Sequence, residues 1–268
     1  MLNHHRPIRV AVLCSHGAPG LIHLLNHSPD RGVAYEIVCC LTSELTFAEE
    51  VRVERRGIPV LVHPIAAFFE ERGASLYHDA RVRASYDAET VDRVTPFFPD
   101  LILLDGYEYL VTQPLLKTFR PRILNLHLAD LASRHRDGGP RFPGLRAVGD
   151  AIAAGCRETR ATVHVVNEKV DDGAPIVRSW PFPVSPLIED LRTREAGEVF
   201  KAYVYAHQQW MLRTAAGPLI SAALRLISTG AVDLDALGNV EGAATTPWVL
   251  DRHGFLLAPE VELAGAAS

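Results

Sequence analysis

The stretch Ile123-Leu124-Asn125-Leu126-His127 decides how this sequence is interpreted. Its apolar residues predict a buried strand, and its two polar residues come at or near the strand's end. Since side chains alternate between the two faces of a strand, Asn125 and His127 point the same way. At the carboxyl end of a parallel strand they lie where open α/β sheets bind their ligands. An amide and an imidazole there indicate a site that polarises a carbonyl group and moves a proton.

A second polar motif, Asp171-Asp172-Gly173, follows farther along the chain and predicts a turn. A carboxylate beside an imidazole can hold the ring in its working tautomer, so a carboxylate of this turn is an expected partner of His127. On spacing alone a plainer interpretation stays open, because a strand-end histidine is often satisfied by a backbone carbonyl and this kind of turn is common.

Apolar runs typical of strands alternate with helical patterns in the first half of the chain. The expected strands are residues 8–13, 35–41, 60–63, 101–104 and 123–127. The expected helices are residues 21–26, 46–56, 88–98 and 113–119. This alternation predicts the α/β class: a Rossmann-like, mostly parallel twisted sheet with helices on both faces.

The second half is expected to continue the fold with two strands, one or two long helices and a short hairpin. These are residues 162–166, 176–184, 187–228 and 248–257. The Asp171–Gly173 turn joins the two strands, and Gly217-Pro218 is expected to break the helical region because proline removes a backbone donor. We expect one domain over residues 1–230 and a C-terminal extension over 231–268.

The composition is that of a soluble globular protein, with 268 residues, 48% of them hydrophobic and 22% charged. A net charge of −5 provides no excess of positive charge for binding nucleic acid or an anionic membrane. No apolar stretch reaches the roughly 20 residues of a membrane helix, and residues 1–7 lack the regions of a signal peptide. We therefore expect a cytoplasmic protein without nucleic-acid or membrane partners. The four cysteines form no Cys-x-x-Cys pair and no mixed His/Cys cluster has ligand spacing, so no metal is expected.

Four linked motifs carry a resemblance to a known family. In chain order they are Asn125-Leu126-His127, Phe142-Pro143-Gly144-Leu145, Ala161-Thr162-Val163-His164 and Asp171-Asp172-Gly173-Ala174-Pro175-Ile176. The sequence resembles the folate-dependent formyltransferases, which carry matching motifs in this order. The resemblance implies the formyltransferase fold, with residues 1–230 as the catalytic domain. It also implies transfer of a formyl group from 10-formyltetrahydrofolate, as co-substrate, to an amine of a small molecule.

The resemblance assigns roles to the polar residues. It makes Asn125 the donor to the oxyanion of a tetrahedral intermediate, His127 the electrostatic and proton-transfer partner, and Asp171 the carboxylate that tunes the imidazole. Asp171 is preferred to Asp172, which is expected to face solvent, because Asp171 keeps the family spacing to the glycine of the turn. His164 is expected beside the folate pocket, with a plain core-edge histidine as the alternative.

The folate side is implied by the loop Gly106-Tyr107-Glu108-Tyr109-Leu110. In the family the matching Gly-Phe-Met-Arg-Ile-Leu loop contacts the pterin through backbone groups and an apolar slot. Gly106, Tyr107, Tyr109 and Leu110 are therefore the expected cofactor-binding residues, together with His164. Tyr109 replaces an arginine, and a pterin can stack on its ring.

The acceptor side departs from the family. The loop Ser15-His16-Gly17-Ala18-Pro19-Gly20 replaces a Gly-Asn-Gly-Ser-Asn loop that cradles the acceptor's phosphate at a helix start. Ser15, Gly17 and Gly20 are the expected acceptor-binding residues, although Pro19 removes one amide donor. Arg213 aligns with a glutamate that binds the acceptor and would reverse its charge. We expect from these departures an acceptor other than glycinamide ribonucleotide.

The loop over residues 128–141 is longer than in the family and contains several cations. It is expected to be either a lid that selects the acceptor or a plain surface loop. A hydrolase acting on 10-formyltetrahydrofolate and a non-catalytic ligand-binding relative remain as alternative functions. The sequence leaves a homodimer open.

Overall fold

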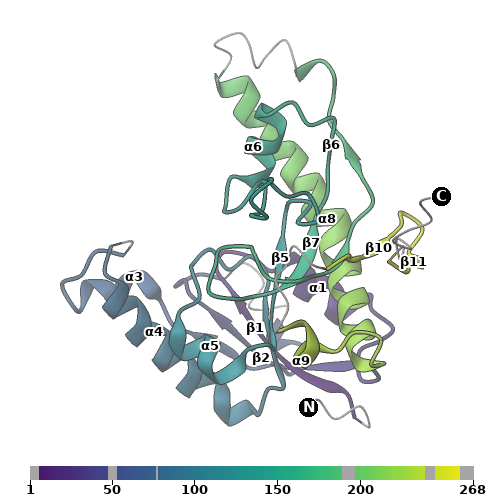
Figure 1. The fold of residues 1–268 in the computed structure, drawn as a ribbon. Helices are drawn as coiled ribbons and strands as arrows, with labels where there is room; N and C mark the ends of the chain where they lie inside the picture. Colours follow the sequence, from purple (N-terminus) through teal and green to yellow (C-terminus); the bar gives the residue numbers. More distant parts are fainter. Residues whose placement is uncertain (1–5, 48–52, 77, 189–196, 239–244, 260–268) are drawn as a thin grey trace.

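The computed structural model describes residues 6–47, 53–76, 78–188, 197–238 and 245–259. Within them, nine strands form one sheet in the order β11-β10-β8-β7-β5-β4-β1-β2-β3 (Figure 1). The strands are β1 Ile8–Cys14, β2 Tyr35–Thr42, β3 Val60–Val62, β4 Leu101–Leu104, β5 Ile123–His127, β7 Thr162–Val165, β8 Pro175–Arg178, β10 Trp248–Leu250 and β11 Leu256–Leu257. A separate small sheet pairs β6 Glu158–Thr159 with β9 Phe182–Pro183.

The predicted fold class is confirmed. The neighbouring strands are parallel from β3 through β2, β1 and β4 to β5. Strand β7 runs antiparallel to both of its neighbours, β5 and β8. The helices are α1 Pro19–Asn26, α3 Ile65–Glu70, α4 Ala80–Val94, α5 Gln113–Phe119, α6 Ala147–Ala153, α8 Gly197–Ser228 and α9 Leu234–Leu237. A 3-10 turn, η1, covers Thr95–Phe97.

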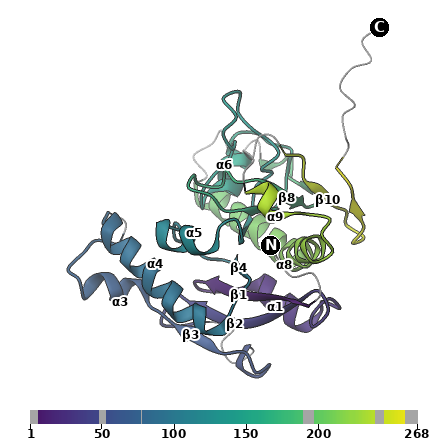
Figure 2. The same ribbon diagram turned by 60° about the horizontal axis from the view of Figure 1, so that its bottom comes forward.

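Strand β1 separates two apolar cores by simple alternation. Val10 and Val12 face the larger core, which includes the buried residues of α1 and α8. Ala11 and Leu13 face the smaller core, which includes residues of α4 and α5. Figure 2 shows these helices on opposite sides of the sheet. Every side chain of β1 except Arg9 is buried, which is the pattern expected of a central parallel strand.

Helices α4 and α8 differ from the sequence-based expectation in where they begin or end. Helix α4 covers Ala80–Val94 instead of residues 88–98, because the Asp79 side chain accepts a hydrogen bond from Val82 N–H and caps the helix earlier. Helix α8 continues through Pro218. Proline costs the helix a hydrogen bond, but Gly217, Leu219 and their neighbours are buried against α1 and the sheet, and this packing holds the helix together. Residues 48–52 of the expected helix at 46–56 lie outside the described residues.

The expected hairpin at 248–257 is confirmed, with β10 and β11 antiparallel. Strand β10 also pairs in parallel with β8, so the hairpin extends the main sheet. The boundary at residue 230 stays a prediction. None of the described helices combines the length and apolar character that a membrane span needs.

Candidate functional site

The site lies at the carboxyl edge of the parallel strands. A cavity of about 1070 Å³ is lined by the segments that follow β1 and β4, by the end of β5, and by one face of α8. Strands β1, β4 and β5 are adjacent and parallel, so their carboxyl ends meet at one edge. This is the position at which open α/β sheets bind ligands.

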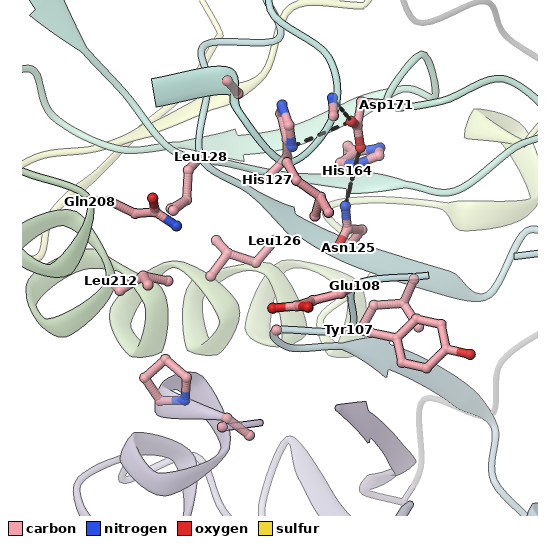
Figure 3. A pocket seen from close by; sticks show the side chains of 18 of the residues that line it. Tyr107, Glu108, Asn125, Leu126, His127, Leu128, His164, Asp171, Gln208 and Leu212 are labelled. Carbon is pink, nitrogen blue, oxygen red and sulfur yellow. Dashed lines mark hydrogen bonds and ion pairs between the residues drawn. The ribbon is translucent and has the colours of Figure 1, made fainter. Parts of the chain in front are cut away.

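Three polar side chains meet on one wall of this cavity (Figure 3). The Nδ1 atom of His127 lies 3.4 Å from Oδ2 of Asp171. The amide nitrogen of Asn125 donates a hydrogen bond of 3.3 Å to Oδ1 of Asp171. The structure therefore brings the predicted residues together, with the carboxylate bridging the two side chains of β5.

The hydrogen bonds of His127 constrain where its proton sits. Its Nε2–H donates to the carbonyl oxygen of Phe142 at 2.8 Å. Nδ1, which faces Asp171, can therefore receive a proton and pass it on. Burial lowers the pKa of His127, and the charge of Asp171 partly offsets that effect. Because the resting ring is favoured as neutral, its free nitrogen is suited to act as a base.

Asp171 is held firmly in place. Burial alone would raise its pKa, but hydrogen bonding with His164 and the charge of His127 lower it to about 2. Its Oδ2 also accepts the Gly144 N–H at 2.7 Å, which ties it to the loop before α6. Its φ of 52° is left-handed, a conformation that aspartate tolerates better than most residues.

The turn after Asp171 requires glycine at position 173. A Cβ atom on Gly173 would lie 1.7 Å from the carbonyl oxygen of Val165. The backbone of the turn therefore packs directly against the backbone of strand β7. This close approach places the Asp171 carboxylate opposite β5. The sequence motif thus has a steric cause.

His164 supports the site from β7, where it lies directly across from Asn125 in the antiparallel pair. Its Nδ1–H donates to the carbonyl oxygen of Val165 at 2.9 Å. Its Nε2 lies 3.2 Å from the amide nitrogen of Asn125 and 3.5 Å from Asp171 Oδ1. The side chain lines the cavity while being almost fully buried. These contacts fit the supporting role better than that of a core-edge histidine.

The predicted folate residues line the cavity on the β4 side. Gly106 has a φ of 71°, and a Cβ there would lie 2.5 Å from the carbonyl oxygen of Gly17. Tyr107 is buried and its hydroxyl accepts a hydrogen bond from Arg83 at 3.0 Å. The rings of Tyr107 and Tyr109 meet edge to face with centroids 5.8 Å apart. Leu110 is exposed at the cavity rim.

Two of the predicted acceptor residues do not line the cavity. Ser15 is fully buried and bonds the Ser43 hydroxyl at 2.9 Å, so it braces the loop from beneath. Gly20 lies inside the fold, where a Cβ would approach Ile220 to 2.3 Å. Both residues were predicted to bind the acceptor from their place in the loop alone. In the structure both are buried and pack within the fold. Gly17 and Arg213 do line the cavity.

Glu108 and Gln208 line the cavity and were not predicted as site residues. Figure 3 shows the Glu108 carboxylate pointing into the cavity and the Gln208 side chain extending from α8. Glu108 donates its backbone N–H to Ser15 Oγ at 3.2 Å, while its carboxylate forms no ion pair with any described residue. The place of Glu108 within the loop of residues 106–110 could have indicated it as a site residue. Nothing in the sequence around Gln208 indicated a role in the site.

For the long loop over residues 128–141, the structure favours a plain surface loop over a lid that selects the acceptor. Among its residues only Leu128 lines the cavity. Arg134 donates to Asp172 and to the carbonyl oxygen of Gly138. The expectation that Asp172 faces solvent is therefore wrong, because this ion pair leaves its side chain only 16% exposed. No cluster of three or more histidine, cysteine or acidic side chains suited to a metal ion exists among the described residues.

The fold and the three polar groups at its sheet edge define an α/β protein with a polar site in a cavity at the carboxyl ends of its parallel strands. A family model described as formyl transferase matches residues 8–196. The chain therefore belongs to the formyl transferase family, which confirms the resemblance inferred from its motifs.

Individual relatives carry related names. The chain is 35% identical over 178 residues to a phosphoribosylglycinamide formyltransferase of Mycobacterium tuberculosis, covering 66% of this chain and 72% of that protein. It is 29% identical over 222 residues to the trifunctional purine biosynthetic protein adenosine-3 of Drosophila pseudoobscura pseudoobscura, covering 82% of this chain. The match spans only 14% of the length of that trifunctional relative.

Solved structures agree on the fold. Glycinamide ribonucleotide transformylase 1 from Symbiobacterium toebii superposes with a TM-score of 0.65 at 26% identity, covering 85% of this chain and 90% of that one. A formyltetrahydrofolate deformylase from Pseudomonas syringae gives a TM-score of 0.61 at 19% identity, covering 85% and 64% respectively. At that identity the second match shows the fold alone.

Proposed function

We propose that this chain transfers a formyl group from 10-formyltetrahydrofolate to the primary amine of a small molecule. The observation that carries the proposal is the meeting of Asn125, His127 and Asp171 on one wall of a large cavity. In the reaction the amine nitrogen attacks the formyl carbon and the carbonyl oxygen becomes an oxyanion. The bond to the folate nitrogen then breaks, and that nitrogen gains the proton that the amine loses.

The three residues divide this work. Asn125 donates an amide hydrogen to the oxyanion, after exchanging its contact with His164 or Asp171 for the substrate. His127 takes the amine's proton on Nδ1 and returns it to the leaving nitrogen. Asp171, with its pKa near 2, is ionised at neutral pH and stabilises the imidazolium that forms between these steps.

The folate is proposed to lie against the loop of residues 106–110. Gly106 leaves the backbone exposed at a position where a Cβ cannot fit, so main-chain groups can contact a flat heterocycle. The paired rings of Tyr107 and Tyr109 offer an aromatic edge and face for stacking. His164 closes the other side of the same space.

The comparisons do not support the expectation of an acceptor other than glycinamide ribonucleotide. The relatives at 35% and 26% identity carry names that specify this acceptor, also written phosphoribosylglycinamide. We therefore propose it as the first acceptor to test. The altered loop at Pro19 and the charge of Arg213 then imply a changed way of holding the same kind of molecule.

The decisive experiment follows tetrahydrofolate release from 10-formyltetrahydrofolate by the purified protein. Release that requires phosphoribosylglycinamide supports the proposal, and release that requires a different amine from a panel supports transfer with another acceptor. Equal release without any amine indicates a hydrolase, the activity named for the Pseudomonas syringae neighbour. No release, together with no folate binding by calorimetry, would leave a non-catalytic relative.

A further inference from the structure

A buried carboxylate occupies the inner side of the start of helix α1. Asp105, the residue after β4, is fully buried, and its Oδ2 accepts the Leu21 N–H at 2.7 Å. A Cβ on Gly20 would lie 3.0 and 3.1 Å from the two carboxylate oxygens. The helix therefore begins against a buried carboxyl group supplied by the protein itself.

This contact changes what the first turn of α1 can bind. A helix start attracts an anion through its free N–H groups and its dipole. Here the Leu21 N–H is already donated to Asp105, and Pro19 has no N–H to offer. When Asp105 is ionised, its charge also repels a second anion. The start of α1 is thus unfavourable for a phosphate.

Side chains with nitrogen donors line the cavity beside this helix start. His23, His27 and Arg213 all belong to the cavity wall. The rings of His23 and His27 lie 5.5 Å apart. His23 packs on Gly217 of α8 so closely that a Cβ there would lie 2.1 Å from the ring. Since Arg213 is four residues before Gly217 on the same helix, it lies on the same face, one turn away.

Arg213 is available to a ligand. Its side chain is exposed and forms no ion pair or hydrogen bond with any part of the chain that the structure describes. A guanidinium group favours planar, two-pronged contact with phosphate or carboxylate. Gln208 and Leu212 of α8 also point into the cavity (Figure 3), so this stretch of the helix is part of the site.

We propose that Arg213, assisted by His23 and His27, binds the phosphate of the amine acceptor in place of the amide groups at the start of α1. The inference rests on the proposed transferase function and adds how the acceptor is recognised. It also explains two departures of the sequence together. Pro19 removes an amide donor at the start of α1, where Asp105 already occupies the Leu21 N–H, and Arg213 supplies another anion position on the facing helix.

The test compares the wild-type protein with Arg213→Gln, using phosphoribosylglycinamide and its dephosphorylated riboside as acceptors. The variant is expected to raise KM for the phosphorylated acceptor about 10- to 100-fold, the range for losing a charged hydrogen bond. It should leave kcat unchanged and the KM for the riboside nearly so. Arg136→Gln is the matched control, because Arg136 is exposed and does not line the cavity.

Calorimetry with phosphoribosylglycinamide alone separates this inference from the proposed reaction. Binding that is weakened by Arg213→Gln but not by Arg136→Gln supports the anion site even if no formyl transfer occurs. Equal affinity of the wild type and Arg213→Gln overturns the inference, as does the absence of any binding to the wild type. A His27→Gln variant with a smaller loss of affinity would support the role given to the histidines, and an unchanged affinity would remove His27 from the site.

Discussion

The proposed catalytic and acceptor walls of the cavity are built differently. Asn125, His127 and Asp171 form the catalytic wall from one strand end and one turn, and their side chains contact one another. The acceptor wall is assembled from α1 and α8, and Arg213 on it contacts no described partner. The first wall is preorganised for one kind of chemistry, whereas the second can change its ligand without disturbing the fold.

The largest expected effect tests the catalytic wall through Asp171→Asn. The change removes the negative charge that stabilises protonated His127, so we expect kcat to fall about 10²- to 10⁴-fold, the usual contribution of such proton-transfer groups. Asparagine tolerates the left-handed backbone at this position, so the fold is expected to persist by circular dichroism.

Asp172→Asn is the matched control for that variant. Asp172 lies next along the chain but pairs with Arg134 away from the cavity. Steady-state kinetics should show near-normal kcat for this control. A normal kcat for Asp171→Asn instead would remove the carboxylate from the proposed mechanism.

Asn125→Ala is the next test, since it removes the proposed oxyanion donor. Loss of one such donor typically costs about 10²- to 10³-fold in kcat, with little change in the KM of either substrate. Asn167→Ala serves as the control, because Asn167 also lines the cavity but its side chain accepts a local hydrogen bond from Lys169 N–H. Equal losses in both variants would mean that the Asn125 amide has no special role.

The catalytic wall was predictable because its cause is local. Alternation along β5 places Asn125 and His127 on one face, and the glycine turn delivers Asp171, so short motifs sufficed. The acceptor wall depends on α1 packing against α8, and only that packing brings His23 beside Gly217. The same packing buries Gly20, whose place in the loop had wrongly indicated ligand binding.

The sheet itself was predictable for a similar reason, and its helices were less so. Continuous apolar runs identify buried parallel strands such as β1 and β4. The unbroken course of α8 through Pro218 was missed because burial of the surrounding residues overrides a local cost. The Asp79 cap that starts α4 lies well before the expected helix.

A third test asks whether Asp105 is a charge built into the acceptor wall. Burial raises its pKa from 3.8 to about 7, although hydrogen bonds from Leu21 and Gly20 oppose the shift. The folded state therefore binds this proton more tightly than the unfolded chain. Its stabilising contribution is complete below pH 3.8 and is lost as pH rises through about 7.

Between pH 3.8 and about 7, this group is expected to lower the free energy of unfolding of the wild type as pH rises. The decrease should reach up to about 1.4 kcal/mol per pH unit. Asp105→Asn should remove that contribution, as measured by urea unfolding at several pH values. Asp137→Asn, on an exposed loop, should keep the wild-type slope. If Asp105→Asn and the wild type show parallel curves, Asp105 is not held as a buried titrating group.

The smallest expected effect concerns Glu108, which lies between the two walls. Its unpaired carboxylate points into the cavity (Figure 3), where it can attract the acceptor's ammonium group before that group loses its proton. The side chain is exposed, so solvent screens the attraction, and Glu108→Gln should raise the acceptor KM only about two- to fivefold. The effect should shrink with added salt and leave kcat unchanged. Glu70→Gln is the control, since Glu70 is exposed and lies outside the cavity wall. A fall in kcat for Glu108→Gln would instead place this carboxylate in the proton transfer, and the catalytic wall would then extend beyond the residues of β5 and the turn.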